Sequence, residues 1–146
     1  MKLIAELCQN HNGNTDIMLR MVEKAAKAGA THVKLQHIFA DNLSYRSEFE
    51  TGYSDNNGMV RCIKRPFLPE YNRLKSLELD EEVVRKFINE CHNQGVIPQT
   101  TCFAREHCES LWDIGFKSIK VASYDCASFQ LLRDLRNYDW DLTIST

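Results

Sequence analysis

The chain alternates between short apolar runs and longer segments in which apolar residues recur at helical spacing. The apolar runs predict five β-strands, at residues 3–7, 32–36, 96–103, 118–122 and 142–145. The amphipathic segments predict four α-helices, at residues 15–28, 80–94, 108–114 and 129–135. Asp80 is a typical helix N-cap, and Gly29, Gly95 and Gly115 each follow a predicted helix as a stop signal. We therefore expect strands and helices to alternate along the chain.

The segment at residues 41–75 interrupts this alternation. It is polar, shows no clear periodicity, and exceeds the roughly 15 residues that loops in compact domains usually reach. A short helix near residues 70–76 is the one element that its pattern predicts. Because long excursions of this kind are usually functional lids or disordered segments, we interpret residues 41–75 as a substrate-side excursion.

Alternating strands and helices predict an α/β fold with a parallel sheet and right-handed crossovers. Two architectures fit: a doubly wound, flavodoxin-like open sheet with strand order 2-1-3-4-5, and a (β/α)8 TIM-type barrel represented by its first five strands and four helices. A length of 146 residues suits a complete open sheet.

Two features favour the barrel instead. The loop after the first strand has a single glycine, Gly13, and so lacks a glycine-rich phosphate loop. The last residues, 143–146, still lie in a β-rich run with no element after it. We therefore expect residues 1–146 to be the N-terminal portion of a (β/α)8 barrel domain, truncated after strand five.

Charge and composition limit the kind of partner. The formal net charge is −2, and acidic and basic residues are mixed, so neither a nucleic acid nor a membrane surface is expected. A small molecule is the expected partner. Glu6 interrupts the first apolar run too early for a signal peptide, which predicts a cytoplasmic protein. The six cysteines form no C-x-x-C pair and are interpreted as reduced thiols, and no zinc-binding spacing is present.

Polar side chains stand near the end of every predicted strand, where a buried strand has no structural need for them. They are Glu6 with residues 9–12, Lys34 and Gln36, Thr100 and Thr101, Lys120 and Ser123, and Ser145. Because the carboxyl ends of parallel strands meet at one rim, these side chains are expected to converge there. Two lysines and several hydroxyls suit a doubly anionic ligand that carries phosphate and carboxylate.

Each of these residues also has a simpler explanation. A lysine near a strand end is ordinarily a solvated charge, but Lys34 and Lys120 share one phase of apolar strands, where burial without a counter-ion is unfavourable. Glu6 either pairs with one of these lysines or serves as an acid/base, and its position alone leaves both readings open. Thr101 is also a favoured strand residue, and His11 is equally consistent with a structural role.

The segment Ile4-Ala5-Glu6-Leu7-Cys8-Gln9-Asn10-His11-Asn12-Gly13 closely resembles the opening motif of the N-acetylneuraminate (sialic acid) synthase family. Four further segments agree with the family in order: residues 28–36, Gln99-Thr100-Thr101-Cys102-Phe103, Ile119-Lys120-Val121-Ala122-Ser123, and Ile144-Ser145-Thr146. The resemblance extends along the whole chain.

The resemblance implies a condensation of phosphoenolpyruvate with an N-acetylated amino sugar, similar to N-acetylmannosamine, that yields a sialic acid-type product and phosphate. The implied phosphoenolpyruvate-binding residues are Lys34, Thr101, Lys120, Ser123 and Ser145. The implied sugar-binding residues are Glu6, Gln36, Asn10 and His11, with Glu6 also the implied catalytic acid/base. The alternative left open is a non-catalytic half-barrel that binds a sugar or an anion.

The resemblance also implies a divalent metal, Mn²⁺ or Mg²⁺, with histidine ligands on later strands and none within this chain. It implies a homodimer for the full-length protein and an inactive fragment when the chain stands alone. The chain departs from the family pattern at three positions: Cys8 replaces a usual glycine, Cys102 a usual proline and Tyr124 a usual small residue. Each departure is expected to reshape the pocket.

Overall fold

The computed structural model describes residues 1–146 and divides into two compact units. The larger unit comprises Met1–His37 and Leu79–Thr146, and the smaller comprises Ile38–Glu78. None of the helices has the length and apolar character needed to cross a membrane.

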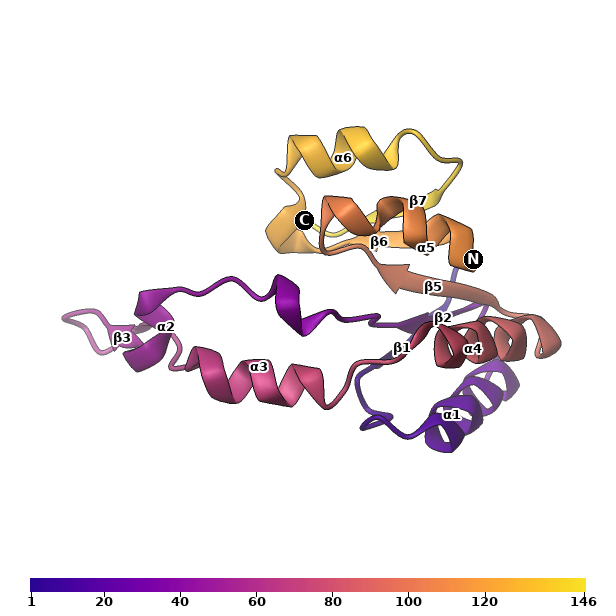
Figure 1. Ribbon diagram of the computed structural model, residues 1–146, viewed down its shortest axis with the longest axis horizontal. Helices are drawn as coiled ribbons and strands as arrows, with labels where there is room; N and C mark the ends of the chain where they lie inside the picture. Colours follow the sequence, from indigo (N-terminus) through magenta and orange to yellow (C-terminus); the bar gives the residue numbers. More distant parts are fainter. The chain divides into compact units, whose positions relative to one another are not determined.

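The larger unit is a parallel sheet with helices in the connections between its strands (Figure 1). Its strands are β1 (Ile4–Cys8), β2 (His32–Leu35), β5 (Ile97–Thr101), β6 (Ser118–Val121) and β7 (Asp141–Ile144). Its helices are α1 (Thr15–Lys27), α4 (Glu81–Asn93), α5 (Cys108–Ile114) and α6 (Phe129–Leu135), with 3-10 turns η2 (Arg105–His107) and η3 (Ser123–Asp125). All nine elements predicted from the pattern are present, with ends displaced by a few residues.

Local capping fixes where the longer helices begin. The Asn14 side chain accepts a hydrogen bond of 2.9 Å from the Ile17 amide at the start of α1, and the Asp80 side chain accepts one of 2.8 Å from the Val83 amide at the start of α4. Each bond satisfies a backbone N–H that the helix itself leaves unpaired. After α1 the chain turns at Gly29, whose φ of 92° lies in the left-handed region that glycine tolerates best.

The strands lie in the order β1-β2-β5-β6-β7, which is their order along the chain. A flavodoxin-like sheet would place the second strand outside the first, so this order excludes the open-sheet alternative and is the order of a barrel. The two edges also meet: the Lys2 ammonium, just before β1, lies 2.6 Å from a carboxylate oxygen of Asp141 in β7. Five flat strands would hold these edges about 19 Å apart, so the sheet is curved.

The two faces of this curved sheet differ in chemistry. The outer face carries apolar residues that are fully buried against the helices, among them Val33, Leu35 and Ile119. From the helices, Val22 of α1 and Phe87 of α4 complete this core. The inner face carries polar residues instead, which is the arrangement that positions the candidate site.

The smaller unit corrects the expectation of a long polar loop at residues 41–75. It contains η1 (Ala40–Asn42), α2 (Ser47–Thr51), an antiparallel hairpin of β3 (Tyr53–Ser54) and β4 (Val60–Cys62), and α3 (Phe67–Lys75). The helix predicted near 70–76 begins three residues earlier, because Pro69 falls in the first turn, where no intrahelical N–H bond is needed.

Candidate active site

A buried lysine and a half-exposed glutamate form the centre of the inner face. Lys34 of β2 is 1% exposed, and its Nζ lies 2.9 Å from Oε2 and 3.2 Å from Oε1 of Glu6 in β1. Burial lowers the pKa of Lys34, the Glu6 carboxylate opposes this shift, and the positive charge of Lys120 adds to it. Of the two roles left open for Glu6, the pairing with Lys34 is therefore present.

Lys34 and Glu6 belong to a polar row that crosses the whole sheet. The strand register places Glu6, Lys34, Gln99, Ser118 and Asp141 side by side on successive strands. The Gln99 amide donates a hydrogen bond of 2.9 Å to the Ser118 hydroxyl, which in turn lies 3.2 Å from the Asp141 carboxylate. Sequence reasoning missed the last three residues, because none of them stands near a strand end with a charge inside an apolar run, and only the register aligns them with Lys34.

A second row follows two residues further along the strands, toward their carboxyl ends. The register pairs Thr101 of β5 with Lys120 of β6, and Lys120 with Thr143 of β7. Thr101 is buried and Lys120 is half-buried. Lys120 lies on the same face of the sheet as Lys34, two strands away, and its positive charge contributes to the lowered pKa of Lys34.

Thr101 and its neighbour Thr100 point to opposite faces of the sheet, as successive strand residues do. The Thr100 hydroxyl oxygen accepts a hydrogen bond of 3.3 Å from the His37 amide and is fully buried. Its contacts are therefore structural, which leaves Thr101 as the threonine on the inner face.

Ser123 and Ser145 lie just beyond the carboxyl ends of two adjacent strands. Ser123 opens η3 after β6 and is exposed, and Ser145 follows β7 and donates its backbone N–H to the Val121 carbonyl over 3.1 Å. The backbone thus places both serines at the same end of the sheet as Thr101 and Lys120.

The candidates for sugar binding occupy the turn after β1 and the end of β2. The Gln9 amide donates a hydrogen bond of 3.1 Å to the Gln36 side chain, which ties the two segments together. Asn10 is exposed. His11 is fully buried: its Nδ1 accepts a hydrogen bond of 3.0 Å from the Gly13 amide, its Nε2 has no hydrogen-bond partner, and burial lowers its pKa. His11 is thus a neutral side chain that shapes this turn.

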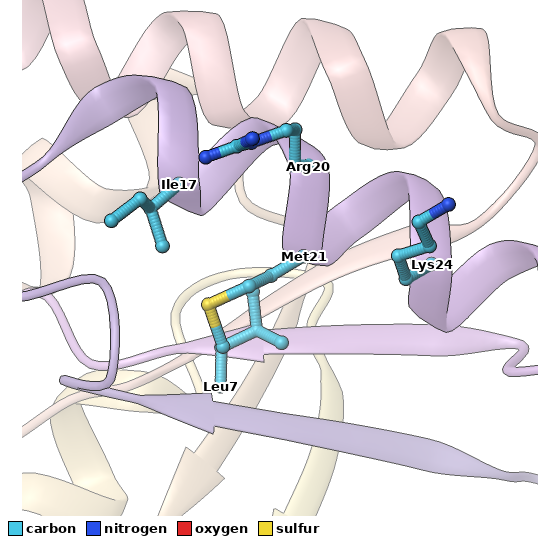
Figure 2. Close-up of a pocket in the computed structure, with 5 residues that line it drawn as sticks. All are labelled: Leu7, Ile17, Arg20, Met21 and Lys24. Carbon is cyan, nitrogen blue, oxygen red and sulfur yellow. The ribbon is translucent and has the colours of Figure 1, made fainter.

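The hollow in Figure 2 lies on the other side of β1. It is lined by Leu7, Ile17, Arg20, Met21 and Lys24, which come from β1 and from one face of α1. Leu7 follows Glu6 directly and therefore points to the opposite face of the strand. This hollow is separate from the polar rows.

The chain contains no group of three or more His, Cys, Asp or Glu side chains that is arranged to hold a metal ion. All six cysteines are free, as predicted, and Cys102 and Cys108 lie closest together, with 3.7 Å between their sulfur atoms.

Comparison with known proteins finds sequence similarity along nearly the whole chain. Over 144 residues the chain is 28% identical to N,N'-diacetyllegionaminic acid synthase of Legionella pneumophila, covering 99% of this chain and 39% of that protein. Over 131 residues it is 28% identical to pseudaminic acid synthase of Campylobacter jejuni, covering 90% of this chain and 36% of that protein. The chain thus spans well under half the length of these relatives.

The fold also matches a solved structure. The crystal structure of the N-acetylneuraminic acid (sialic acid) synthetase of Leptospira borgpetersenii superposes with a TM-score of 0.71 at 24% identity, over 97% of this chain and 43% of that one. The five strands and their helices therefore have the fold of a TIM-type barrel, as predicted. The NeuB family model matches residues 21–146. This chain belongs to the NeuB family.

Proposed function

We propose that the complete protein containing this chain condenses phosphoenolpyruvate with an N-acetylated amino sugar to give a sialic acid-type nonulosonic acid. The C3 carbon of phosphoenolpyruvate attacks the aldehyde carbon of the open-chain sugar, water adds at C2, and phosphate leaves by cleavage of its C–O bond. The observation that carries this proposal is the pair of lysines, Lys34 and Lys120, which the strand register places on the same polar inner face.

The electrostatics of this pair suit an anionic substrate. Lys34 is buried at a cost that Glu6 offsets only in part, so a phosphate or carboxylate beside the two ammonium groups would stabilise their charged forms. Thr101 ends β5, and Ser123 and Ser145 follow β6 and β7, so all three hydroxyl residues lie at the carboxyl end of the sheet. In this proposal these five residues hold phosphoenolpyruvate.

Glu6 is the proposed acid/base. Its side chain is 36% exposed although it forms an ion pair with Lys34, so the carboxylate can still contact a ligand. Gln36, which Gln9 positions, is proposed to orient the sugar, with Asn10 and His11 contributing from the adjacent turn.

The proposed cofactor is a divalent metal, Mn²⁺ or Mg²⁺, which would polarise the aldehyde oxygen as a Lewis acid. The side chains of this chain offer no ligand set of three or more for it, so the ligands are proposed to come from other parts of the complete protein. The residues described here bind and orient the organic substrates.

A phosphate-release assay tests the proposal. The complete protein is incubated with phosphoenolpyruvate, Mn²⁺ and, in turn, N-acetylmannosamine, its phosphate and 2,4-diacetamido sugars, which the names of the legionaminic and pseudaminic acid synthases suggest. Phosphate release with at least one sugar is expected. Its absence with every sugar would contradict the proposal, and calorimetric binding of phosphoenolpyruvate without turnover would favour the non-catalytic alternative.

A further inference from the structure

The backbone at Cys8 is unusual for a residue with a side chain. Its φ of 50° lies in the left-handed region, where Asn12 is the other non-glycine residue of the chain. The strand register breaks at the same point: Glu6 pairs with Lys34, whereas Cys8 pairs with Leu35, so that two residues of β1 stand opposite one of β2. This is a β-bulge, a feature that re-aims neighbouring groups and is often found beside active sites.

The bulge directs Cys8 back onto the Glu6 carboxylate. The Cys8 backbone N–H donates a hydrogen bond of 3.1 Å to Glu6 Oε1, the same oxygen that Lys34 reaches at 3.2 Å. Burial and the negative charge of Glu6 raise the pKa of the Cys8 thiol, while the positive charges of Lys34 and Lys120 oppose this shift.

These contacts leave part of the Glu6 side chain open. Lys34 and the Cys8 backbone N–H hold the carboxylate, and 36% of the side chain stays exposed. We propose that Cys8 is a positioning residue, because the left-handed bulge at Cys8 aims its backbone N–H at the Glu6 carboxylate and so orients it. This inference rests on the proposed role of Glu6 as the acid/base.

Side-chain replacements at Cys8 in the complete protein separate positioning from packing. Cys8→Val places a β-branched residue at a left-handed φ of 50°, which it adopts poorly, and should withdraw the backbone N–H from Glu6, so kcat for phosphate release is expected to fall about 3- to 10-fold. The KM for phosphoenolpyruvate should stay within about twofold, because the two lysines are untouched. Cys8→Gly removes the whole side chain but tolerates this backbone angle and keeps the amide, so it should retain most of kcat. An unchanged kcat in Cys8→Val, or an equal loss in Cys8→Gly, would overturn the inference.

A second measurement tests the contact without relying on catalysis. Alkylation of Cys8 by iodoacetamide is followed by mass spectrometry in the wild type and in Glu6→Gln, with exposed Cys126 as the internal reference. Removing the carboxylate removes an interaction that disfavours the thiolate, so Cys8 should react several-fold faster while Cys126 is unchanged. An unchanged Cys8 rate overturns the Cys8–Glu6 contact, whereas a wild type that releases no phosphate overturns the proposed function instead.

Discussion

Lys34 is the largest fully buried side chain of the chain, and a buried lysine is unfavourable unless it is paired. Its pKa is lowered because burial outweighs the compensation from Glu6. The buried charge therefore contributes little to stability. A buried ammonium group whose burial is only partly compensated suits the binding role proposed for it.

Replacement of Lys34 tests that role directly. Lys34→Met in the complete protein should weaken phosphoenolpyruvate binding about 10- to 100-fold, the effect of removing a charge-assisted hydrogen bond. The melting temperature should stay equal or rise, because methionine is buried without a charge and Glu6 remains open to water. Calorimetry and thermal melting measure the two effects, with Lys86→Met on the exposed face of α4 as control. Retained affinity would contradict the role.

The sequence predicted some members of each polar row and missed others, for a physical reason. Lys34 and Lys120 stand out because a charge inside an apolar run has no structural explanation. Gln99 and Ser118 stand at strand positions where uncharged polar residues are common, and their burial becomes visible only when the register aligns them with Lys34. The role of Cys8 depends on a backbone angle, which side-chain type does not reveal.

At the scale of single elements, helix α4 is amphipathic, and its buried face packs against the sheet. Phe87 is fully buried and packs against Phe116, with 6.3 Å between ring centroids. Phe87→Ala should lower the free energy of unfolding by about 3 to 5 kcal/mol, since it removes a large core side chain and leaves a cavity. Urea denaturation measures this. The exposed neighbour Lys86→Ala should change it by less than about 0.5 kcal/mol, and an equal effect in both variants would contradict the assigned packing.

Apart from the helix near residues 70–76, the elements at residues 38–78 were not predicted. Ion pairs and short turns stabilise this segment, and these leave no hydrophobic period in the sequence. Glu70 in α3 accepts hydrogen bonds of 2.8 and 2.9 Å from Arg73 and pairs with Arg65 as well. At Gly52, whose φ is 62°, a Cβ would come within 2.6 Å of the Lys64 amide nitrogen, so the turn after α2 requires glycine. A periodicity argument detects neither feature.

Glu70 gives this segment a pH dependence with a defined sign. Hydrogen bonds from Arg73 and then Arg65, against burial, lower the pKa of Glu70 from 4.5 to about 2. A lowered carboxylate pKa stabilises the folded state above pH 4.5, and this stabilisation is lost as the pH falls toward 2. At pH 4.5, Glu70→Gln should therefore destabilise residues 38–78 by about 1 to 2 kcal/mol, and pepsin should cut them about 5- to 30-fold faster than in the wild type.

The difference between wild type and Glu70→Gln should vanish as the pH approaches 2, where the carboxyl group becomes protonated in both states. Glu81→Gln, which breaks an exposed pair with Arg85 in α4, is the matched control and should leave cutting within 38–78 unchanged. Equal rates for wild type and Glu70→Gln at pH 4.5 would contradict the ion-pair explanation.

At the scale of the whole chain, curvature brings the sheet edges together only at one end. Asp141 contacts Lys2 and lies 3.4 Å from His32, so the floor of the curved sheet is closed by polar contacts between β7, β2 and the residue preceding β1. Above this floor, β1 and β7 each have a neighbour on one side only. Their outer backbone groups are free to pair with another strand.

We therefore expect the 146-residue chain to self-associate when it is expressed alone. Leu142 and Ile144 of the edge strand β7 are 40% and 45% exposed, which adds apolar surface to the unpaired backbone. Light scattering over a range of concentrations should show oligomers that grow with concentration. Ile144→Lys places a charge on this edge and should shift the chain toward monomer, whereas Ile63→Lys, at an exposed position of the smaller unit, should not. A monodisperse monomer of the wild-type chain at every concentration would mean that these edges are protected, because open apolar edges in a parallel sheet otherwise favour strand addition.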